Sequence, residues 1–194
     1  MLANPGSERI SPMFNVNLGC RALVLALLVL SGCASVQTPR PEAAERTTVF
    51  VVRHAEKDPT PGLKDPPLTG IGQQRAEALR ETLGAYPVAA LYTTDTVRTR
   101  ATLAPLAAAL GLEPQVYEAA QPDVLAARLR ERHRGRTVVV VGHSNTVLPL
   151  IEALGAARPV SELTDADYDY LFEVTLRPEG GATVRVQRYG AGQR

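Results

Sequence analysis

Residues 47–56 read TTVFVVRHAE, and residues 137–145 read TVVVVGHSN. Each stretch begins with a continuous run of β-branched and other apolar residues, which is typical of a parallel strand buried on both faces of a sheet. A histidine follows each run after one further residue: His54 follows Arg53, and His143 follows Gly142. We therefore predict two central strands, with a histidine directly after the carboxyl end of each.

The rest of the chain alternates strand-like and helix-like segments. Further strands are predicted over residues 88–92, 168–176 and 182–187. Helices are predicted over residues 68–83, 98–110, 124–134 and 145–154, with Thr69 and Asn145 as N-caps of the first and the last. This alternation favours an α/β fold, a three-layer sandwich in which helices flank a mostly parallel central sheet.

The composition indicates one globular domain. The chain has 194 residues, of which 45% are hydrophobic and 21% charged, close to the averages for soluble proteins. A formal net charge of +1 argues against a broad basic surface for nucleic acid. The cysteines, Cys20 and Cys33, both lie near the N-terminus, so neither a disulfide framework nor a cysteine metal site is expected in the domain.

Residues 22–30, ALVLALLVL, form an apolar run that follows Arg21. The run is shorter than the roughly 20 residues that cross a bilayer, and small residues follow it, as in a secretory signal peptide. Leu30-Ser31-Gly32-Cys33 resembles a bacterial lipobox, which implies lipid attachment at Cys33. The alternative is an ordinary buried N-terminal helix.

We accordingly expect three parts in the chain: a lipoprotein signal peptide at 1–32, a flexible tether at 33–46 and a single domain at 47–194. Met13 is an alternative start. The expected location is the cell envelope, with the domain lipid-anchored on the periplasmic face of the outer membrane.

Three strand ends carry side chains suited to a phosphate ligand. Ligands of open α/β sheets bind outside the carboxyl ends of the strands, where Arg53, His54, Arg98 and His143 are expected. A guanidinium group binds phosphate through two parallel hydrogen bonds, and a neutral imidazole can attack phosphorus. A single histidine at a strand end is more often structural, but the combination favours a phosphate site.

These residues resemble the histidine phosphatase superfamily, branch 1, the phosphoglycerate-mutase-like fold. The resemblance rests on three motifs: Arg53-His54-Ala55-Glu56, Leu68-Thr69-Gly70-Ile71-Gly72 and Gly142-His143-Ser144-Asn145-Thr146. It implies that His54 is the nucleophile and forms a phosphohistidine, and that Arg53, Arg98 and His143 complete the phosphate pocket. Ala55 stands where the family usually has glycine. The inserted segment that supplies a general acid in mutases is minimal here, and Glu118 is the candidate acid, with an ordinary exposed loop carboxylate as the alternative.

The predicted activity is metal-independent hydrolysis of phosphomonoesters, with a small phosphorylated substrate and no metal or cofactor. Two alternatives remain: a non-catalytic phosphate- or phosphoglycan-binding lipoprotein, and a phosphoprotein phosphatase. The arginine-rich run at 128–136 is expected to be mainly a solvated face, with lipid contact as the less favoured alternative, and His133 within it a surface residue. The acidic cluster at 165–169 lacks the pattern of a calcium loop, so no metal is assigned to it.

Overall fold

The computed structural model describes residues 46–190 of the chain. The expected signal peptide and the lipid attachment at Cys33 lie outside these residues, as does all of the expected tether except Arg46. The described part forms a six-stranded sheet in the order β3-β2-β4-β1-β5-β6. The strands are β1 (Thr47–Arg53), β2 (Val88–Thr93), β3 (Gln115–Val116), β4 (Thr137–Gly142), β5 (Tyr170–Leu176) and β6 (Ala182–Arg188).

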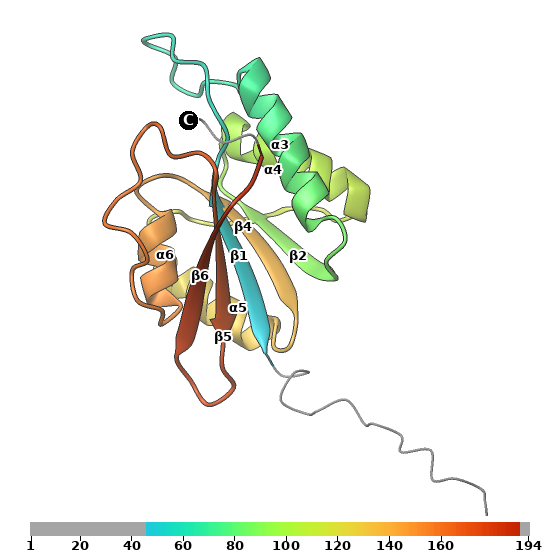
Figure 1. Ribbon diagram of the computed structural model, residues 1–194, viewed down its shortest axis with the longest axis vertical. Helices are drawn as coiled ribbons and strands as arrows, with labels where there is room; N and C mark the ends of the chain where they lie inside the picture. The colour runs from blue at the N-terminus through green and yellow to red at the C-terminus, as the bar shows by residue number, and fades with distance from the viewer. Residues whose placement is uncertain (1–45, 191–194) are drawn as a thin grey trace, which may run out of the picture. The chain divides into compact units, whose positions relative to one another are not determined.

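The sheet is mixed, and its central strands are parallel. β4 pairs in parallel with β1 on one side and with β2 on the other, and β3 extends the parallel part beyond β2. β5 runs antiparallel to both β1 and β6. The carboxyl ends of β1, β2 and β4 therefore meet at one end of the sheet, the upper end in Figure 1.

Helices cover both faces of the sheet, as Figure 1 shows. The helices are α3 (Gly70–Leu83), α4 (Val97–Leu110), α5 (Pro122–Arg132) and α6 (Val147–Ala153). Alternate residues of β1 point to opposite faces: Val49 and Val51 pack in a core with α5 and α6, whereas Phe50 and Val52 pack in a second core with α3 and α4. The apolar run of β1 is fully buried because it lies between two helical layers.

The structure differs from the local predictions at α6 and at β3. α6 begins at Val147 with Thr146 as its N-cap, not Asn145, because a tight turn closed by bonds from the Thr146 and Val147 amides to the His143 carbonyl precedes it. The two-residue strand β3 was not predicted, because a pair of residues carries no periodicity.

No helix among residues 46–190 is long and apolar enough to span a membrane.

The prediction that His133 is a surface residue is wrong. His133 is 9% exposed, and its Nε2 lies 2.9 Å from the hydroxyl of the buried Tyr92. The two rings meet edge to face, with centroids 5.7 Å apart. His133 follows the last residue of α5, and its ring points toward the sheet, whereas the neighbouring arginines contact solvent. Burial lowers the pKa of His133, and the charges of Arg136 and Arg132 lower it further.

Candidate active site

A cavity of about 450 Å³ lies at the carboxyl ends of β1 and β4. Four of the five residues predicted for the site line it: Arg53 and His54 after β1, Arg98 in the first turn of α4, and His143 after β4. The remaining lining consists of Lys57, Ala119, Ala120, Ser144, Asn145, Thr146 and Asp165. Segments that are far apart in the sequence therefore bring two imidazoles and two guanidinium groups to one hollow.

His54 is buried and held in one tautomer. Its Nδ1 lies 2.8 Å from the carbonyl oxygen of Ala55. Because a carbonyl oxygen only accepts hydrogen bonds, Nδ1 carries the proton and Nε2 keeps its lone pair. Burial lowers the pKa of His54 from 6.5 to about 3; the charges of Arg53 and Arg98 act in the same direction, and the bond to Ala55 opposes them. His54 is thus a neutral imidazole with a free nucleophilic nitrogen.

His143 is neutral for related reasons but is bonded at both nitrogens. Its Nδ1 lies 3.3 Å from Nη2 of Arg98, which can only donate, so Nδ1 accepts and Nε2 carries the proton. Nε2 then donates to Oγ1 of Thr94 at 2.9 Å. Burial lowers the pKa of His143 to about 4, with further lowering by Arg98 and Arg53. The rings of His54 and His143 meet edge to face at 5.4 Å.

Arg98 is oriented by the loop that connects β1 to α3. Asp65, in this loop, accepts a bond from Arg98 Nη1 at 3.1 Å through one carboxylate oxygen. Its other oxygen accepts from the backbone amide of Val97 at 2.9 Å, at the start of α4. Asp65 thus fixes both the helix start and the guanidinium, and Nη2 of Arg98 reaches His143.

Arg53 is held by the segment that precedes β5. Its Nη1 donates to the Thr164 carbonyl at 2.5 Å, and its Nη2 donates to Asp165 at 3.0 Å. Its guanidinium also lies 4.1 Å from the ring centroid of Tyr168. The side chain of Arg53 is 3% exposed, whereas that of Asp165 is 96% exposed. The acidic cluster considered above as a cation site therefore includes a residue that binds an arginine of the cavity.

The Nε–H groups of Arg53 and Arg98 are buried donors without an acceptor among the described residues. An unpaired buried donor costs about 1–3 kcal/mol, so such groups are rare in folded proteins. Both donors belong to arginines that line the cavity of His54. Two further unpaired buried atoms of the described residues, Nδ1 of His133 and the hydroxyl of Tyr189, lie outside it.

The backbone that carries His54 is fixed from behind. The buried Thr102 of α4 accepts a bond from the Ala55 amide at 2.8 Å. Glu56 forms a buried ion pair with Arg75 of α3, with the closest atoms 2.7 Å apart. Ala55 is fully buried against Leu68 and Ala76, so the methyl group that replaces the hydrogen of the family's usual glycine is accommodated by apolar packing.

The structure separates Glu118 from the other predicted residues. Glu118 is exposed and lines a different cavity, of about 110 Å³, whereas the next two residues, Ala119 and Ala120, line the cavity of His54. The role of Glu118 as general acid stays a prediction.

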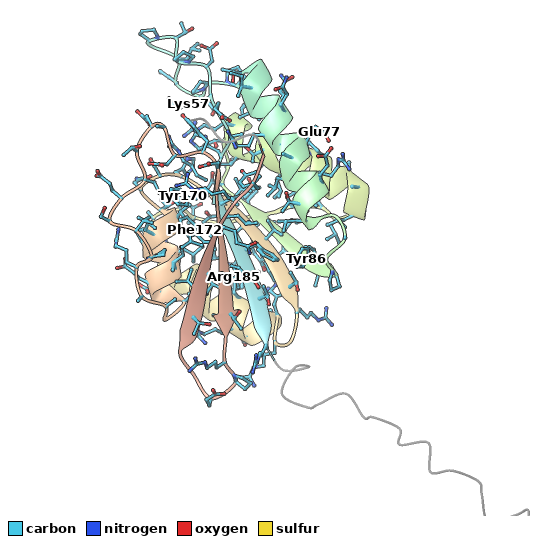
Figure 2. All side chains as sticks on the ribbon, viewed as in Figure 1. Lys57, Glu77, Tyr86, Tyr170, Phe172 and Arg185 are labelled. Atoms are coloured by element: carbon cyan, nitrogen blue, oxygen red, sulfur yellow. The ribbon has the colours of Figure 1, made fainter. Side chains whose placement is uncertain are left out.

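Sequence reasoning missed several residues of the site. Lys57 lines the cavity three residues after His54, near the upper end of the sheet in Figure 2. The sequence could have indicated Lys57 as a site residue through its position close to Arg53 and His54. Thr94, Asp65 and Thr102 act through hydrogen bonds to the site, and no spacing rule would have revealed these contacts. Among residues 46–190 there is no group of three or more His, Cys, Asp or Glu side chains that could hold a metal ion.

Part of the sequence is similar to known proteins. The profile of the histidine phosphatase superfamily (branch 1) matches residues 49–121, a segment that includes Arg53, His54 and Arg98. PE-PGRS family protein PE_PGRS11 of Mycobacterium tuberculosis is 40% identical over 75 residues, which are 34% of this chain and 12% of that protein. The chain thus spans only a small part of the length of this relative.

Solved structures share the fold at low sequence identity. Mycobacterial glucosyl-3-phosphoglycerate phosphatase has a TM-score of 0.60 at 17% identity, over 76% of this chain and 100% of that one. The protein histidine phosphatase SixA, complexed with tungstate, has a TM-score of 0.58 at 21% identity, over 73% of this chain and 96% of that one. These likenesses confirm the predicted α/β fold, a central sheet flanked by helices, of the phosphoglycerate-mutase-like type.

Proposed function

We propose that this protein is a phosphatase of the histidine phosphatase superfamily, branch 1, which hydrolyses phosphomonoesters through a phosphohistidine on His54 and needs no metal. The observation that carries the proposal is the state of His54: a neutral imidazole whose Nδ1–H is bound to the Ala55 carbonyl, with Nε2 unpaired beside Arg53 and Arg98. The match of the family profile over these residues supports it.

In the first step, the lone pair of His54 Nε2 forms a bond to phosphorus as the bond from phosphorus to the ester oxygen breaks. The product is a phosphorylated imidazole and an alcohol. The Nδ1–H bond to Ala55 stabilises the positive charge that the ring acquires. Arg53 and Arg98, which line the cavity, stabilise the charge of the transferring phosphoryl group.

In the second step, water attacks the phosphohistidine. The bond from Nε2 to phosphorus breaks, the electron pair returns to the ring, and inorganic phosphate leaves. The proton that water loses is taken up by a base, the same group that protonated the leaving oxygen in the first step.

Two carboxylates are candidates for that acid and base. Glu118 is the one predicted from the sequence, and it would have to move from its neighbouring cavity. Asp165 is the second, because it lines the cavity of His54 with an exposed carboxylate. The two carboxylates can be distinguished with substrates whose leaving groups differ. Removing the carboxylate that acts as the acid should slow hydrolysis of an alkyl phosphate far more than hydrolysis of p-nitrophenyl phosphate, because the nitrophenolate leaving group needs no proton. The variants to compare are Glu118→Gln and Asp165→Asn.

The mechanism is tested with p-nitrophenyl phosphate in the presence of EDTA. We expect turnover that survives chelation and a loss of at least about 10³-fold in His54→Ala, because removing the nucleophile removes the covalent route. Rapid denaturation at alkaline pH, where phosphohistidine persists, should trap phosphate on the wild type only. Arg80→Ala removes an arginine outside the cavity and should keep full activity.

The principal alternative is a phosphate-binding protein without turnover. No hydrolysis of aryl or alkyl phosphates at any pH from about 4 to 9, combined with phosphate binding by the wild type, would establish that alternative and end the enzyme proposal. Loss of turnover in the presence of EDTA would contradict the metal-independent mechanism, but the protein would still be a phosphatase.

A second candidate substrate class is phosphorylated protein. It is favoured by the likeness to a protein histidine phosphatase and by the small side chains, Ala119, Ala120 and Ser144, along the cavity. Comparing kcat/KM for a phosphohistidine peptide with kcat/KM for sugar phosphates decides between it and the small-molecule substrate proposed from the sequence.

We also propose that the enzyme is a lipoprotein of the cell envelope, anchored through Cys33 on the periplasmic face of the outer membrane. The lipobox-like Leu30-Ser31-Gly32-Cys33 supports this. Labelling of growing cells with a palmitate analogue should mark the wild type and not Cys33→Ser. Equal labelling of both would overturn the anchor without affecting the proposed chemistry.

A further inference from the structure

The arginines of the described residues fall into two groups. Eight of them form ion pairs with carboxylates of other described residues: Arg53, Arg75, Arg80, Arg98, Arg100, Arg158, Arg185 and Arg188. The other seven form none within residues 46–190: Arg46, Arg128, Arg130, Arg132, Arg134, Arg136 and Arg177. Five of the nine exposed arginines belong to this second group, so their position on the surface requires an explanation.

Six of the seven lie together at the end of the sheet opposite the cavity of His54, and we call them the basic face: Arg46, Arg130, Arg132, Arg134, Arg136 and Arg177. Backbone contacts join the segments that carry them. The Gly135 amide donates to Thr47 Oγ1 at 3.0 Å, and the Thr48 amide donates to the Arg136 carbonyl at 3.0 Å. The β5–β6 turn with Arg177 lies at this end of the sheet too, the lower end in Figure 1.

The basic face is exposed and surrounds a hollow. All of its members except the half-buried Arg130 are exposed. Arg130, Arg134 and Arg177 line a cavity of about 490 Å³, together with Thr47, Gly135, Leu176 and Pro178. Among the described residues, the acidic residues in the same segments are Glu131 and Glu179, against six arginines. The overall charge of +1 therefore conceals a concentrated positive region.

The chain enters the domain at the basic face. Arg46 immediately precedes β1, so the preceding part of the sequence joins the domain at this point. The thirteen residues from Ala34 to Arg46 could span at most about 45 Å when extended, so an anchor at Cys33 would keep this end of the domain close to a bilayer.

We propose that the basic face binds the phosphate-bearing headgroups of anionic lipids and orients the domain on the membrane. Exposed arginines without acidic partners fit such headgroups, and the hollow between Arg134 and Arg177 offers space for one. β1 spans the sheet from this face to His54, a rise of roughly 20 Å for its seven residues. The cavity of His54 then opens away from the membrane. This surface goes beyond the proposed phosphatase activity and does not depend on it.

The test uses the chain from Ala34 to Arg194, which keeps every described residue and lacks the lipid and the apolar segment. Co-sedimentation is measured with vesicles of phosphatidylcholine alone and with about 30% phosphatidylglycerol, at low and high salt. We expect binding to the anionic vesicles only, and its loss in about 0.5 M salt, where surface charges are screened.

The decisive comparison is between two triple variants of equal charge. Arg132→Gln, Arg134→Gln and Arg136→Gln together should weaken partitioning onto anionic vesicles by about 100-fold, since each arginine near such a surface contributes about a factor of five. The matched control, Arg80→Gln, Arg158→Gln and Arg185→Gln, removes three ion-paired arginines from elsewhere and should bind like the wild type. Should the first triple variant fail to fold, Arg134→Gln with Arg177→Gln tests the same face with two substitutions on separate segments.

Three results would overturn the proposal: no binding of the wild type to anionic vesicles, equal weakening in both triple variants, or binding to a soluble polyanion without binding to vesicles. His54→Ala should bind vesicles as the wild type does. This variant separates the two proposals, since it abolishes the proposed phosphatase activity and leaves the membrane surface intact.

Discussion

His54 and His143 are both neutral imidazoles beside arginines, yet their hydrogen bonds suit them to different tasks. Within residues 46–190, His54 forms a hydrogen bond only through Nδ1, which leaves the lone pair of Nε2 free. His143 uses Nδ1 to accept from Arg98 and Nε2 to donate to Thr94, so it positions Arg98 and has no free lone pair. This difference in hydrogen bonding favours His54 over His143 as the proposed nucleophile, without reference to any relative.

Because His54 and His143 are neutral, their pKa values set the pH below which kcat/KM should fall. The pKa values of His54 and His143 are lowered to about 3 and about 4, so the free enzyme holds both in the active form above pH 5. We expect kcat/KM for p-nitrophenyl phosphate, whose leaving group needs no proton, to stay constant from pH 7 to pH 5 after correction for ionisation of the substrate phosphate. It should fall about tenfold per pH unit only below about pH 4. An acid limb centred between pH 6 and 7 would show that a histidine with an ordinary pKa controls the reaction.

At the scale of elements, the approach of α3 to the loop after β1 places a strict demand on one residue. Thr69 caps α3 through its side chain, and its amide binds the Glu56 carbonyl at 2.9 Å. This contact brings Gly72 so close to the loop that a Cβ there would lie 2.2 Å from the Glu56 carbonyl oxygen. The glycine of the Leu-Thr-x-x-Gly motif is therefore explained by backbone contact two residues beyond His54.

Gly72→Ala should consequently destabilise the domain. The methyl group forces α3 away from backbone atoms that cannot rotate aside, and we expect a loss of about 2–3 kcal/mol in the free energy of unfolding, measured in urea. Gly70→Ala is the matched control, because a Cβ at that position meets open space, and it should be neutral or slightly stabilising. Equal stability of the two variants would contradict this account of the motif.

The elements with strong patterns were predictable from the sequence, whereas contacts between elements were not. The β-branched runs of β1 and β4 predict buried parallel strands, and both strands occupy the centre of the sheet. The sequence around His133 reads as a basic surface, but the ring turns inward to Tyr92 on another element. The bonds of Arg53 to Thr164 and Asp165 likewise depend on a segment more than a hundred residues away, which no local pattern reveals.

At the scale of the whole domain, the two ends of the sheet differ in how their charges are arranged. At the carboxyl end of β1, Arg53 and Arg98 are each tied to an aspartate and partly enclosed. At the amino end, the arginines of the basic face, all exposed except the half-buried Arg130, have no acidic partners among the described residues. The first arrangement suits one small anion held in a fixed position, and the second suits many anions on an extended surface.

Holding buried histidines neutral also links the stability of the whole domain to pH. Burial lowers the pKa of His54, His143 and His133 in the folded state, while the unfolded chain restores each to about 6.5. Below pH 6.5 the unfolded chain therefore binds protons that the folded domain does not, and the free energy of unfolding falls as pH decreases. For His54 and His143 the loss continues to about pH 4, where the folded domain begins to bind the same protons.

We expect the free energy of unfolding in phosphate-free buffer to fall by up to about 1.4 kcal/mol per pH unit for each of these two histidines between pH 6 and pH 4.5. Urea unfolding at pH 7, 6, 5 and 4.5 measures this slope. Carboxylates whose pKa values are lowered, such as Asp58 and Asp167, lose their contribution only below about pH 4 and do not enter this window. The double variant His54→Gln, His143→Gln should therefore have a much flatter slope over the same range. An unchanged slope in that variant would mean that these two rings are not held neutral by the fold, and the nucleophilic state assigned to His54 would lose its physical basis.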